Sequence, residues 1–318
     1  MMESGIMVSV IMLAYNHEKY IAQAIESVLA QRTAFSYELL IGDDASGDTT
    51  PEIIRAYAHR APDRVRPVLR RENLGATKNL SDLMCRARGR YVAYLEGDDF
   101  WCDGEKLQRQ VDFLEQHADY IGCTHRCRIV NEAGQPCKKQ TLPWISRRAA
   151  YTARDFKGLI LPGHPSTLMH RNIFTEDADG WRPVIECDPL IGDRSLALLL
   201  MARGPIRQLP RIMSCYRQRQ GQNATSVAYT RNDDCIRGDY VYTKKLAHYA
   251  QQMGVDGGFQ THYRGLFVSA VWHSLRGTGS LALARQIAEE GCPAVYIAYL
   301  PFGIVKKAIQ RSKGERET

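Results

Sequence analysis

Several patterns that would place a protein in a class at once are missing from this 318-residue chain. Its nine cysteines are scattered without a CxxC pair, which argues against a disulfide framework. Cys123 and Cys127 lie four residues apart, but no second pair of ligands follows at the spacing that a closed zinc site needs. The N-terminus has neither the basic start nor the long apolar run of a signal peptide. The longest apolar stretch, Cys292 to Val305, is interrupted by two prolines and is too short to span a bilayer. These absences predict a cytoplasmic protein with reduced thiols.

Glycine-rich phosphate loops are missing too. The first apolar run, Val8 to Leu13, is followed by Ala14-Tyr15-Asn16-His17, which is neither the GxGxxG of a dinucleotide oxidoreductase nor the basic, glycine-rich loop normal in a sugar nucleotidyltransferase. What is present is an ordinary globular composition, 44% hydrophobic and 24% charged, with a net charge of +7. The positive charge favours an anionic partner such as nucleic acid, a lipid surface or a phosphorylated substrate, without choosing among them.

The first hundred residues alternate between strand and helix patterns. Apolar, β-branched runs predict strands at 8–13, 38–42, 65–69 and 90–95, and helical periodicity predicts helices at 21–29, 50–57 and 78–88. This series predicts an open α/β sheet with right-handed crossovers. Further helices are expected at 104–116, 153–161 and 193–202, strands at 120–124, 128–131 and 166–169, and after residue 228 only helices, at 234–253, 259–275 and 280–290. We therefore expect a domain at 1–227 and a helical module at 228–318.

Polar side chains cluster where the predicted strands end, which is where ligands bind in such sheets. The acidic run Glu96-Gly97-Asp98-Asp99 follows the fourth strand. Carboxylates this close repel one another, and their oxygens suit Mg²⁺ or Mn²⁺, which would bridge the phosphates of a nucleotide diphosphate. The alternative is a solvated acidic turn in which Gly97 serves only the bend.

Three further segments have both a binding and a purely structural interpretation. Asp43 and Asp44 end the second strand and could accept hydrogen bonds from a base or ribose, or could close an Asx-turn. Asn73 and Lys78 flank the start of the third helix, where phosphate could bind, or belong to a solvated charge cluster. Asp193 precedes an apolar helical run and could be a simple N-cap.

Together these segments resemble the inverting family-2 glycosyltransferases of the GT-A fold, in particular the bacterial branch that builds surface polysaccharides. The resemblance is carried by VSVIMLAYN (8–16), DDASGDT (43–49), Asn73-Leu74-Gly75 and YLEGDDFW (94–101), and continues more weakly to about residue 222. It implies a GT-A fold, an open mixed sheet flanked by helices, here with a C-terminal helical extension. It also implies a nucleotide-sugar donor, with UDP as the nucleotide by family habit, and Mn²⁺ or Mg²⁺ as cofactor.

The resemblance also implies roles for individual residues. Tyr15 would stack on or pack beside the base, and Asp44 would bind its imide. Asp98 would contact the ribose or the metal, and Asp99 would be the principal metal ligand. Asp193 would be the catalytic base, with Glu186 and Asp188 as the nearest acidic alternatives. The whole implied set is Ala14, Tyr15, Asn16, Asp43, Asp44, Asn73, Lys78, Glu96, Gly97, Asp98 and Arg217 for the donor, Asp98 and Asp99 for metal, Asp193 for catalysis, and His164 and Tyr216 on the acceptor side.

Two departures from the family pattern bear on the metal. The usual DxD begins here with Glu96, an EGDD variant, and Arg219 replaces the histidine that relatives often carry. If that histidine helps bind metal or diphosphate, Arg219 must act as a direct cation instead.

The C-terminal stretch 292–313 combines apolar and basic residues and suits either contact with an anionic inner membrane, where a polyprenyl-linked acceptor would reside, or packing on the catalytic domain. We expect a glycan or lipid-linked acceptor and no nucleic acid. A non-catalytic nucleotide-sugar-binding protein remains an alternative to the enzyme.

Overall fold

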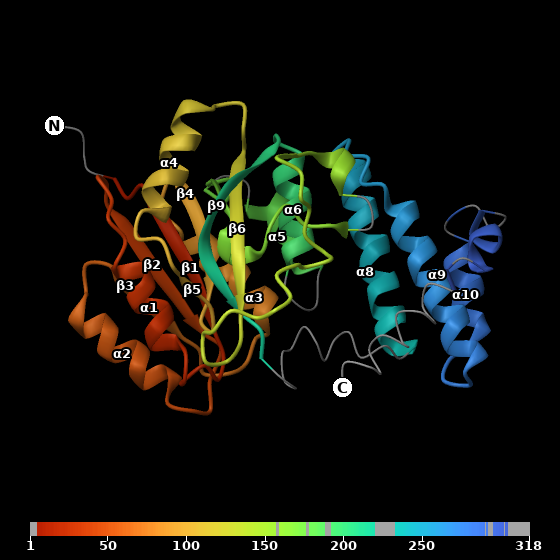
Figure 1. The fold of residues 1–318 in the computed structure, drawn as a ribbon, viewed down its shortest axis with the longest axis horizontal. Helices are drawn as coiled ribbons and strands as arrows, with labels where there is room; N and C mark the ends of the chain where they lie inside the picture. The colour runs from red at the N-terminus through yellow and green to blue at the C-terminus, as the bar shows by residue number, and fades with distance from the viewer. Residues whose placement is uncertain are drawn as a thin grey trace. The chain divides into compact units, whose positions relative to one another are not determined.

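The computed structural model describes residues 5–156, 159–175, 178–187, 192–219, 233–289, 291, 295–301 and 303–304. They belong to two compact units (Figure 1). The first unit comprises residues 1–155 and 160–220, and the second comprises residues 156–159 and 221–318. The domain boundary predicted after residue 227 falls in the stretch 220–232, outside the described residues.

The first unit is built on one mixed sheet with the strand order β3-β2-β1-β4-β8-β6-β9-β5, and a further strand, β7, pairs with β9. Its first four strands are mutually parallel, and they are β1 Val8–Ala14, β2 Tyr37–Asp43, β3 Val65–Leu69 and β4 Tyr91–Glu96. Strands β1 and β2 are buried on both faces, as their uninterrupted apolar runs predict. All four predicted strands are therefore confirmed.

Helices cover both faces of this parallel half. Val8, Val10 and Met12 of β1 share a buried cluster with α1, α2 and α4. On β2, a side chain at Gly42 would collide with Asn79 of α3, so glycine lets that helix pack closely. The helices of the first unit are α1 Ile21–Leu29, α2 Thr50–Arg60, α3 Ala76–Arg86, α4 Lys106–Gln116, α5 Ala178–Glu186 and α6 Asp193–Met201.

The other half of the sheet differs from the sequence prediction in three places. Segments 120–124 and 128–131 form one strand, β6, because register shifts around Arg126 let it pair continuously with β9. Residues 166–169 are not one strand: Pro165 starts a 3₁₀ turn capped by His164, and the strand begins at Met169. Where a helix was predicted at 153–161, the described residues show only 3₁₀ conformation, in the turn Ala153–Asp155 and at Leu159.

Four elements of this half were not predicted at all: the two-residue strands β5 and β7, the long strand β9 and the helix α5. Strand β9 contains a proline and several arginines, so it has no continuous apolar run, and α5 carries Pro183 inside the helix. Strand β8 pairs antiparallel with β4, β6 pairs antiparallel with β8, and β9 runs parallel to β6. The strands of this half are β5 Phe100–Trp101, β6 Gly122–Val130, β7 Ala150–Tyr151, β8 Met169–Arg171 and β9 Ile206–Arg217.

The second unit is helical, as predicted. Its described helices include α8 Asp233–Gln252, α9 Phe259–Leu275 and α10 Leu281–Ala288, which enclose a core of their own around Tyr263, Phe267 and Tyr296. No described helix is both long enough and apolar enough to cross a membrane. Most of the apolar and basic stretch 292–313 lies outside the described residues, although Val295 and Ile297 are described and exposed.

Candidate active site

Two loops at the carboxyl ends of β1 and β2 are tied together by side chains that the sequence marked as donor-binding. The Asp43 carboxylate accepts hydrogen bonds from the backbone N–H and the hydroxyl of Ser46, at 3.1 and 2.5 Å. The Ser46 hydroxyl accepts the Asn16 N–H, and Asn16 Oδ1 accepts the N–H of Gly47. Asp43 and Asn16 therefore shape the loops. Tyr15, on this edge, leaves 48% of its surface exposed, so its ring is available to a ligand.

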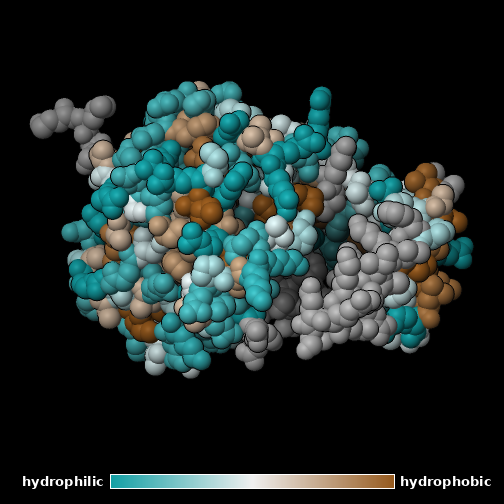
Figure 2. Space-filling view, viewed as in Figure 1, coloured by the Kyte–Doolittle hydropathy of each residue, from teal (hydrophilic) through white to brown (hydrophobic). Residues whose placement is uncertain are grey.

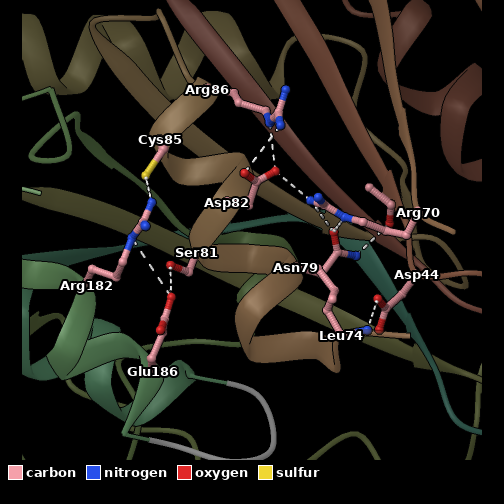
Figure 3. Close-up of polar contacts among 11 residues, drawn as sticks. Asp44, Arg70, Leu74, Asn79, Ser81, Asp82, Cys85, Arg86, Arg182 and Glu186 are labelled. Carbon is pink, nitrogen blue, oxygen red and sulfur yellow. Dashed lines mark hydrogen bonds and ion pairs between the residues drawn. The ribbon is translucent and has the colours of Figure 1, made fainter. Parts of the chain in front are cut away.

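Asp44 connects the end of β2 to the loop before α3 (Figure 3). Its two carboxylate oxygens accept the backbone N–H groups of Leu74 and Gly75, at 2.8 and 2.9 Å. Asn73 Oδ1 accepts the same Gly75 N–H. Each Asp44 oxygen keeps a second lone pair, so the contact to a base that the resemblance implies remains open. The exposed Lys78 lies in the first turn of α3 beside this loop.

Helix α3 is fastened on both sides (Figure 3). Arg70 reaches Asn79 and Asp82, and Asn79 donates to the backbone carbonyl of Gly42 at 2.9 Å. Toward α5, the Ser81 hydroxyl donates to Glu186 at 2.8 Å. Glu186, one of the alternative base candidates, is thus already engaged, and the other, Asp188, lies outside the described residues.

The acidic run follows β4 in a tight turn. Gly97 donates its N–H to the carbonyl of Leu13 at 2.8 Å, which places the turn directly against β1. A Cβ at this position would come within 2.7 Å of His17 Nδ1 and 2.9 Å of the Ile21 side chain. Only glycine fits here without displacing these neighbours, so Gly97 sets the position of the carboxylates that follow it.

The two aspartates of the run face different partners. Asp98 Oδ2 lies 3.8 Å from His17 Nε2 and 3.5 Å from the Arg219 guanidinium. Asp99 is buried; its Oδ1 accepts the backbone N–H of Arg217 at 2.8 Å, whereas its Oδ2 has no hydrogen-bond partner among the described residues. The nearest ion-pairing group is His164 Nδ1, at 3.7 Å.

His164 does not neutralise Asp99. Its Nδ1 accepts the backbone N–H of Ser166 and lies 2.9 Å from the Ser166 hydroxyl, and burial lowers the pKa of the ring to about 3. The imidazole is therefore neutral and offers Asp99 no positive charge. The His164 ring also packs on Tyr216, with 4.3 Å between ring centroids.

The local electrostatics show a deficit of positive charge. Burial, together with the charges of Asp98 and Asp193, raises the pKa of Glu96 to about 8. Burial, with the charges of Asp98 and Glu96, also raises the pKa of Asp99 well above its ordinary value. A cation placed among these groups would restore their charged forms. The Asp99 oxygen without a hydrogen bond is where such a cation fits.

The donor set suits a cation that also uses ligands from outside the protein. Among the described residues, no three carboxylate, imidazole or thiol side chains converge closely enough to form a complete metal cage. Mg²⁺ and its analogues are usually held by one or two carboxylates, with water and substrate phosphates filling the other positions. Asp98 and Asp99 match such a site, in which the protein supplies only two of the ligands.

Arg217 is a support of the site and is not free to bind a ligand. Its guanidinium donates to the carbonyls of Asp98 and Glu132, at 2.8 and 2.6 Å, and to Gln23 Oε1 at 2.7 Å. The residue is 2% exposed, so the contact to a diphosphate expected from the sequence would require it to leave these partners. Two residues later, Arg219 is the cation that faces Asp98.

Asp193 is brought to the acidic run from far along the chain. It is the first residue of α6, whose N-cap is Gly192 with a φ of 68°, so the alternative that Asp193 is a simple N-cap is wrong. Its charge contributes to the raised pKa values of both Glu96 and Tyr94, which places it within electrostatic reach of the carboxyl end of β4. Along the chain, Asp193 is about 95 residues from this run.

His17 and Ser166 were not among the site residues predicted from the sequence. Both lie close to predicted site residues, since His17 directly follows Tyr15-Asn16 and Ser166 lies two residues after His164. Burial lowers the pKa of His17, and its Nδ1 is buried without a hydrogen-bond partner among the described residues. The signal in both cases was a polar residue close to a predicted site residue.

The chain resembles known proteins over part of its length. It is 42% identical over 153 residues to an uncharacterised protein of Mycobacterium tuberculosis, covering 46% of this chain and 44% of that protein. It is 40% identical over 119 residues to EpsE of Bacillus subtilis, to which glycosyltransferase activity is attributed, covering 37% and 42%. It is 38% identical over 112 residues to TuaG of the same bacterium, assigned to teichuronic acid biosynthesis, covering 35% and 43%. The chain thus spans less than half the length of these relatives.

Solved structures show the same fold at low sequence identity. The Staphylococcus aureus protein TarS (residues 1–349), solved with UDP-GlcNAc, superposes with a TM-score of 0.62 at 16% identity, covering 98% of this chain and 92% of that one. The mannosyltransferase PcManGT of Pyrobaculum calidifontis, solved with GDP-Man and Mn²⁺, superposes with a TM-score of 0.52 at 14% identity, covering 97% and 87%. The predicted GT-A-like sheet with C-terminal helices is confirmed by this likeness.

A family assignment follows from the sequence itself. The family described as glycosyl transferase family 2 matches residues 9–176, which is just over half of the chain and contains nearly all of the parallel half of the sheet together with the acidic run. The chain belongs to glycosyl transferase family 2.

Proposed function

We propose that this chain is an inverting glycosyltransferase that moves a sugar from a nucleoside-diphosphate sugar, with UDP as the nucleotide, to a hydroxyl of a glycan or lipid-linked acceptor in surface polysaccharide synthesis. The observation that carries the proposal is the grouping of Asp98, Asp99 and Arg219 at the carboxyl end of β4, with Asp193 within electrostatic reach of the same strand end. Residues 1–227 would form the catalytic domain, and residues 228–318 a helical module that brings it to the inner face of the membrane.

The donor would lie across the ends of β1, β2 and β4. The exposed Tyr15 ring offers a surface for the base, and Asp44 holds the 73–75 loop beside it. Glu96 and Gly97 would fix the turn beneath the ribose, and Arg219 is the half-buried cation available to the diphosphate. The UDP-GlcNAc bound in the TarS structure supports a UDP-sugar donor.

Asp98 and Asp99 would hold a divalent cation, whose positive charge would offset that of the diphosphate. The Asp99 oxygen without a hydrogen bond supports this assignment, as does the Mn²⁺ in the PcManGT structure. The EGDD variant keeps both aspartates, and Glu96 would act outside the metal shell.

Asp193 would accept the proton of the acceptor hydroxyl as that oxygen attacks the anomeric carbon. Arg219 would face the phosphate oxygens of the leaving nucleotide, and one displacement inverts the anomeric configuration. His164 and Tyr216, stacked beside Asp99, would border the acceptor. The base must be ionised near neutral pH, and an aspartate ordinarily is.

The test of this function is Asp193→Asn, compared with Glu186→Gln. If Asp193 is the base, its variant keeps nucleotide binding while sugar transfer falls by about 10²–10⁴-fold, the usual contribution of a positioned base. Glu186→Gln should keep transfer near wild type, since Ser81 already engages that carboxylate. A fast Asp193→Asn enzyme would remove Asp193 from catalysis, and a wild-type chain that binds the donor but neither transfers nor hydrolyses it would be a binding protein.

The metal is tested separately by calorimetry. Asp99→Asn should remove the part of nucleoside diphosphate affinity that depends on Mn²⁺ and leave the melting temperature close to wild type, because the Arg217 N–H can still donate to the remaining oxygen. Equal Mn²⁺-dependent affinity in the variant would rule out Asp99 as a ligand.

A further inference from the structure

Positive charge in the first unit is concentrated on one part of the sheet. Residues 122–150 and 206–219, which contain β6, β9 and the loop between β6 and β7, carry ten lysine and arginine residues and a single acidic residue, Glu132. Figure 2 shows mostly hydrophilic side chains over the part of the first unit where Figure 1 places β6 and β9. We call residues 122–150 and 206–219 the basic face.

Most of these cations have no carboxylate partner in the part of the chain that the structure describes. Three of the ten form ion pairs: Arg148 with Asp155, Arg211 with Asp103 and Arg219 with Asp98. A fourth, Arg217, is buried and donates its hydrogen bonds inside the site. The other six have no acidic group within ion-pair distance among the described residues, and all are at least partly exposed: Arg126, Arg128, Lys138, Lys139, Arg147 and Arg207.

The contrast with the rest of the first unit is clear. On the parallel half of the sheet, several exposed arginines are paired with acids, for example Arg60 with Glu26, Arg88 with Glu38 and Arg90 with Glu115. Unpaired like charges repel one another and cost stability, unless a ligand of opposite charge uses them. The basic face therefore has the character of a binding surface.

The basic face is continuous with the candidate active site. Arg128 of β6 is in register with Cys215 of β9, two residues before Arg217. The loop after β6 folds back on the strand end, where the Cys137 N–H donates to the carbonyl of Ile129 at 2.9 Å. This fold-back sets Lys138 and Lys139 near Arg128. The Arg217 guanidinium in turn donates to the carbonyls of Asn131 and Glu132 at the tip of the same loop.

The shape of the basic face favours a long ligand. Strand β9 has 12 residues, and at about 3.3 Å per residue the surface along it, from Arg207 near its start to the site at its end, extends roughly 30 Å. That length exceeds any single nucleotide or sugar and matches an extended chain. Trp144, 44% exposed in the loop, adds an aromatic surface on which the apolar face of a sugar ring can rest.

We propose that the basic face binds the acceptor, and that this acceptor is an extended glycan whose repeating units carry phosphate or carboxylate groups. The inference rests on the proposed function, because it supplies the substrate class for the acceptor side of that site. Arg128, Lys138 and Lys139 are the unpaired cations nearest the site and are expected to hold the charged unit next to the reacting one.

The experiment compares two triple variants of the full chain that lose the same charge. The first is Arg128→Gln with Lys138→Gln and Lys139→Gln. The second is the control Arg237→Gln with Lys245→Gln and Arg276→Gln, three exposed cations of the second unit. The probes are an oligogalacturonate chain, inorganic polyphosphate of similar length, neutral dextran and vesicles of an anionic phospholipid, each at low and high salt. Nucleoside diphosphate binding is measured in parallel.

We expect the wild-type chain to bind both polyanions at least about tenfold more tightly than dextran, with affinity that falls as salt rises. The first triple variant should lose about tenfold in affinity for the polyanions, and the control less than about twofold. Equal losses in the two variants, or equal binding of dextran, would overturn the proposal. Binding of vesicles without binding of soluble polyanions would make the surface a membrane contact and also overturn it. Nucleotide binding should stay at the wild-type level in both variants, and its absence from the wild-type chain would count against the proposed function instead.

Discussion

Replacement of Arg217 by methionine distinguishes a support of the active site from a ligand-binding cation. Arg217→Met keeps an apolar side chain against Tyr20 and Phe100 but removes every donor of the buried guanidinium. The carbonyls of Asp98, Asn131 and Glu132 and the side-chain oxygen of Gln23 then lose their partner. A buried acceptor left without a partner costs about 1–3 kcal/mol, and partial access of water to the loop favours the lower end, so we expect a loss of about 3–5 kcal/mol.

Thermal unfolding followed by circular dichroism measures this loss. A domain of this size shifts by about 2–4 °C per kcal/mol, so the melting temperature should fall by roughly 10 °C. Arg219→Met is the matched control on the same segment: it removes one ion pair, with Asp98 at 3.5 Å, and not a set of four hydrogen bonds, so its melting temperature should fall much less. Arg219→Met should instead weaken nucleoside diphosphate binding. An Arg217→Met chain that melts like wild type and fails only to bind nucleotide would refute the support role.

Three other contacts give further predictions. Gly97→Ala should weaken nucleotide binding about tenfold, because its Cβ would lie 2.7 Å from His17 Nδ1, whereas Gly47→Ala, with nothing within 4 Å, should bind normally; calorimetry measures both. Glu38 is buried and accepts hydrogen bonds from Arg66 and Arg88, which lower its pKa. The ionised carboxylate should therefore stabilise the folded chain fully above its ordinary pKa of 4.5, and this stabilisation should be lost as pH falls through the lower folded-state pKa. Denaturant unfolding from pH 7 to pH 3 should show this loss in wild type and a much smaller one in Glu38→Gln. The exposed Cys102 thiol has its pKa lowered to about 7 by a hydrogen bond with Cys215, so alkylation by iodoacetamide should reach half its maximal rate near that pH, and nearer the ordinary thiol value in Cys215→Ala.

The parallel half of the sheet and the donor loops were predictable because their signals are local. The strand at 8–13 is a short, mostly apolar run followed by a turn, and the helix after it has one apolar face. In an open α/β sheet the carboxyl ends of such strands share one edge, so the position of Tyr15, Asp44 and Asp99 near one another follows from the order of elements alone.

The other half of the sheet, from β8 to β5, was less predictable because its strands depend on their partners. Strand β9 has no apolar run of its own, and it is a strand because β6, β5 and β7 supply its hydrogen bonds. Strand β6 looked like two segments because the register shift around Arg126 interrupts the alternation of buried and exposed residues. The strand propensities of single residues predict neither the pairing of β9 nor the register shift in β6, because the preference of a residue for a strand depends more on its neighbours in the sheet than on the residue itself.

The sequence by itself determined the family, the α/β order and the residues that would meet at the sheet edge, because motifs and periodicity are properties of short segments. Tertiary structure decided what each of those residues does. Arg217 became a support because carbonyls from residues 98, 131 and 132 converge on its guanidinium, and Asp99 kept one oxygen without a hydrogen bond among the described residues because His164 is held neutral beside it. These roles depend on groups that lie far apart along the chain, and only the folded chain brings their charges and hydrogen bonds within reach of one another.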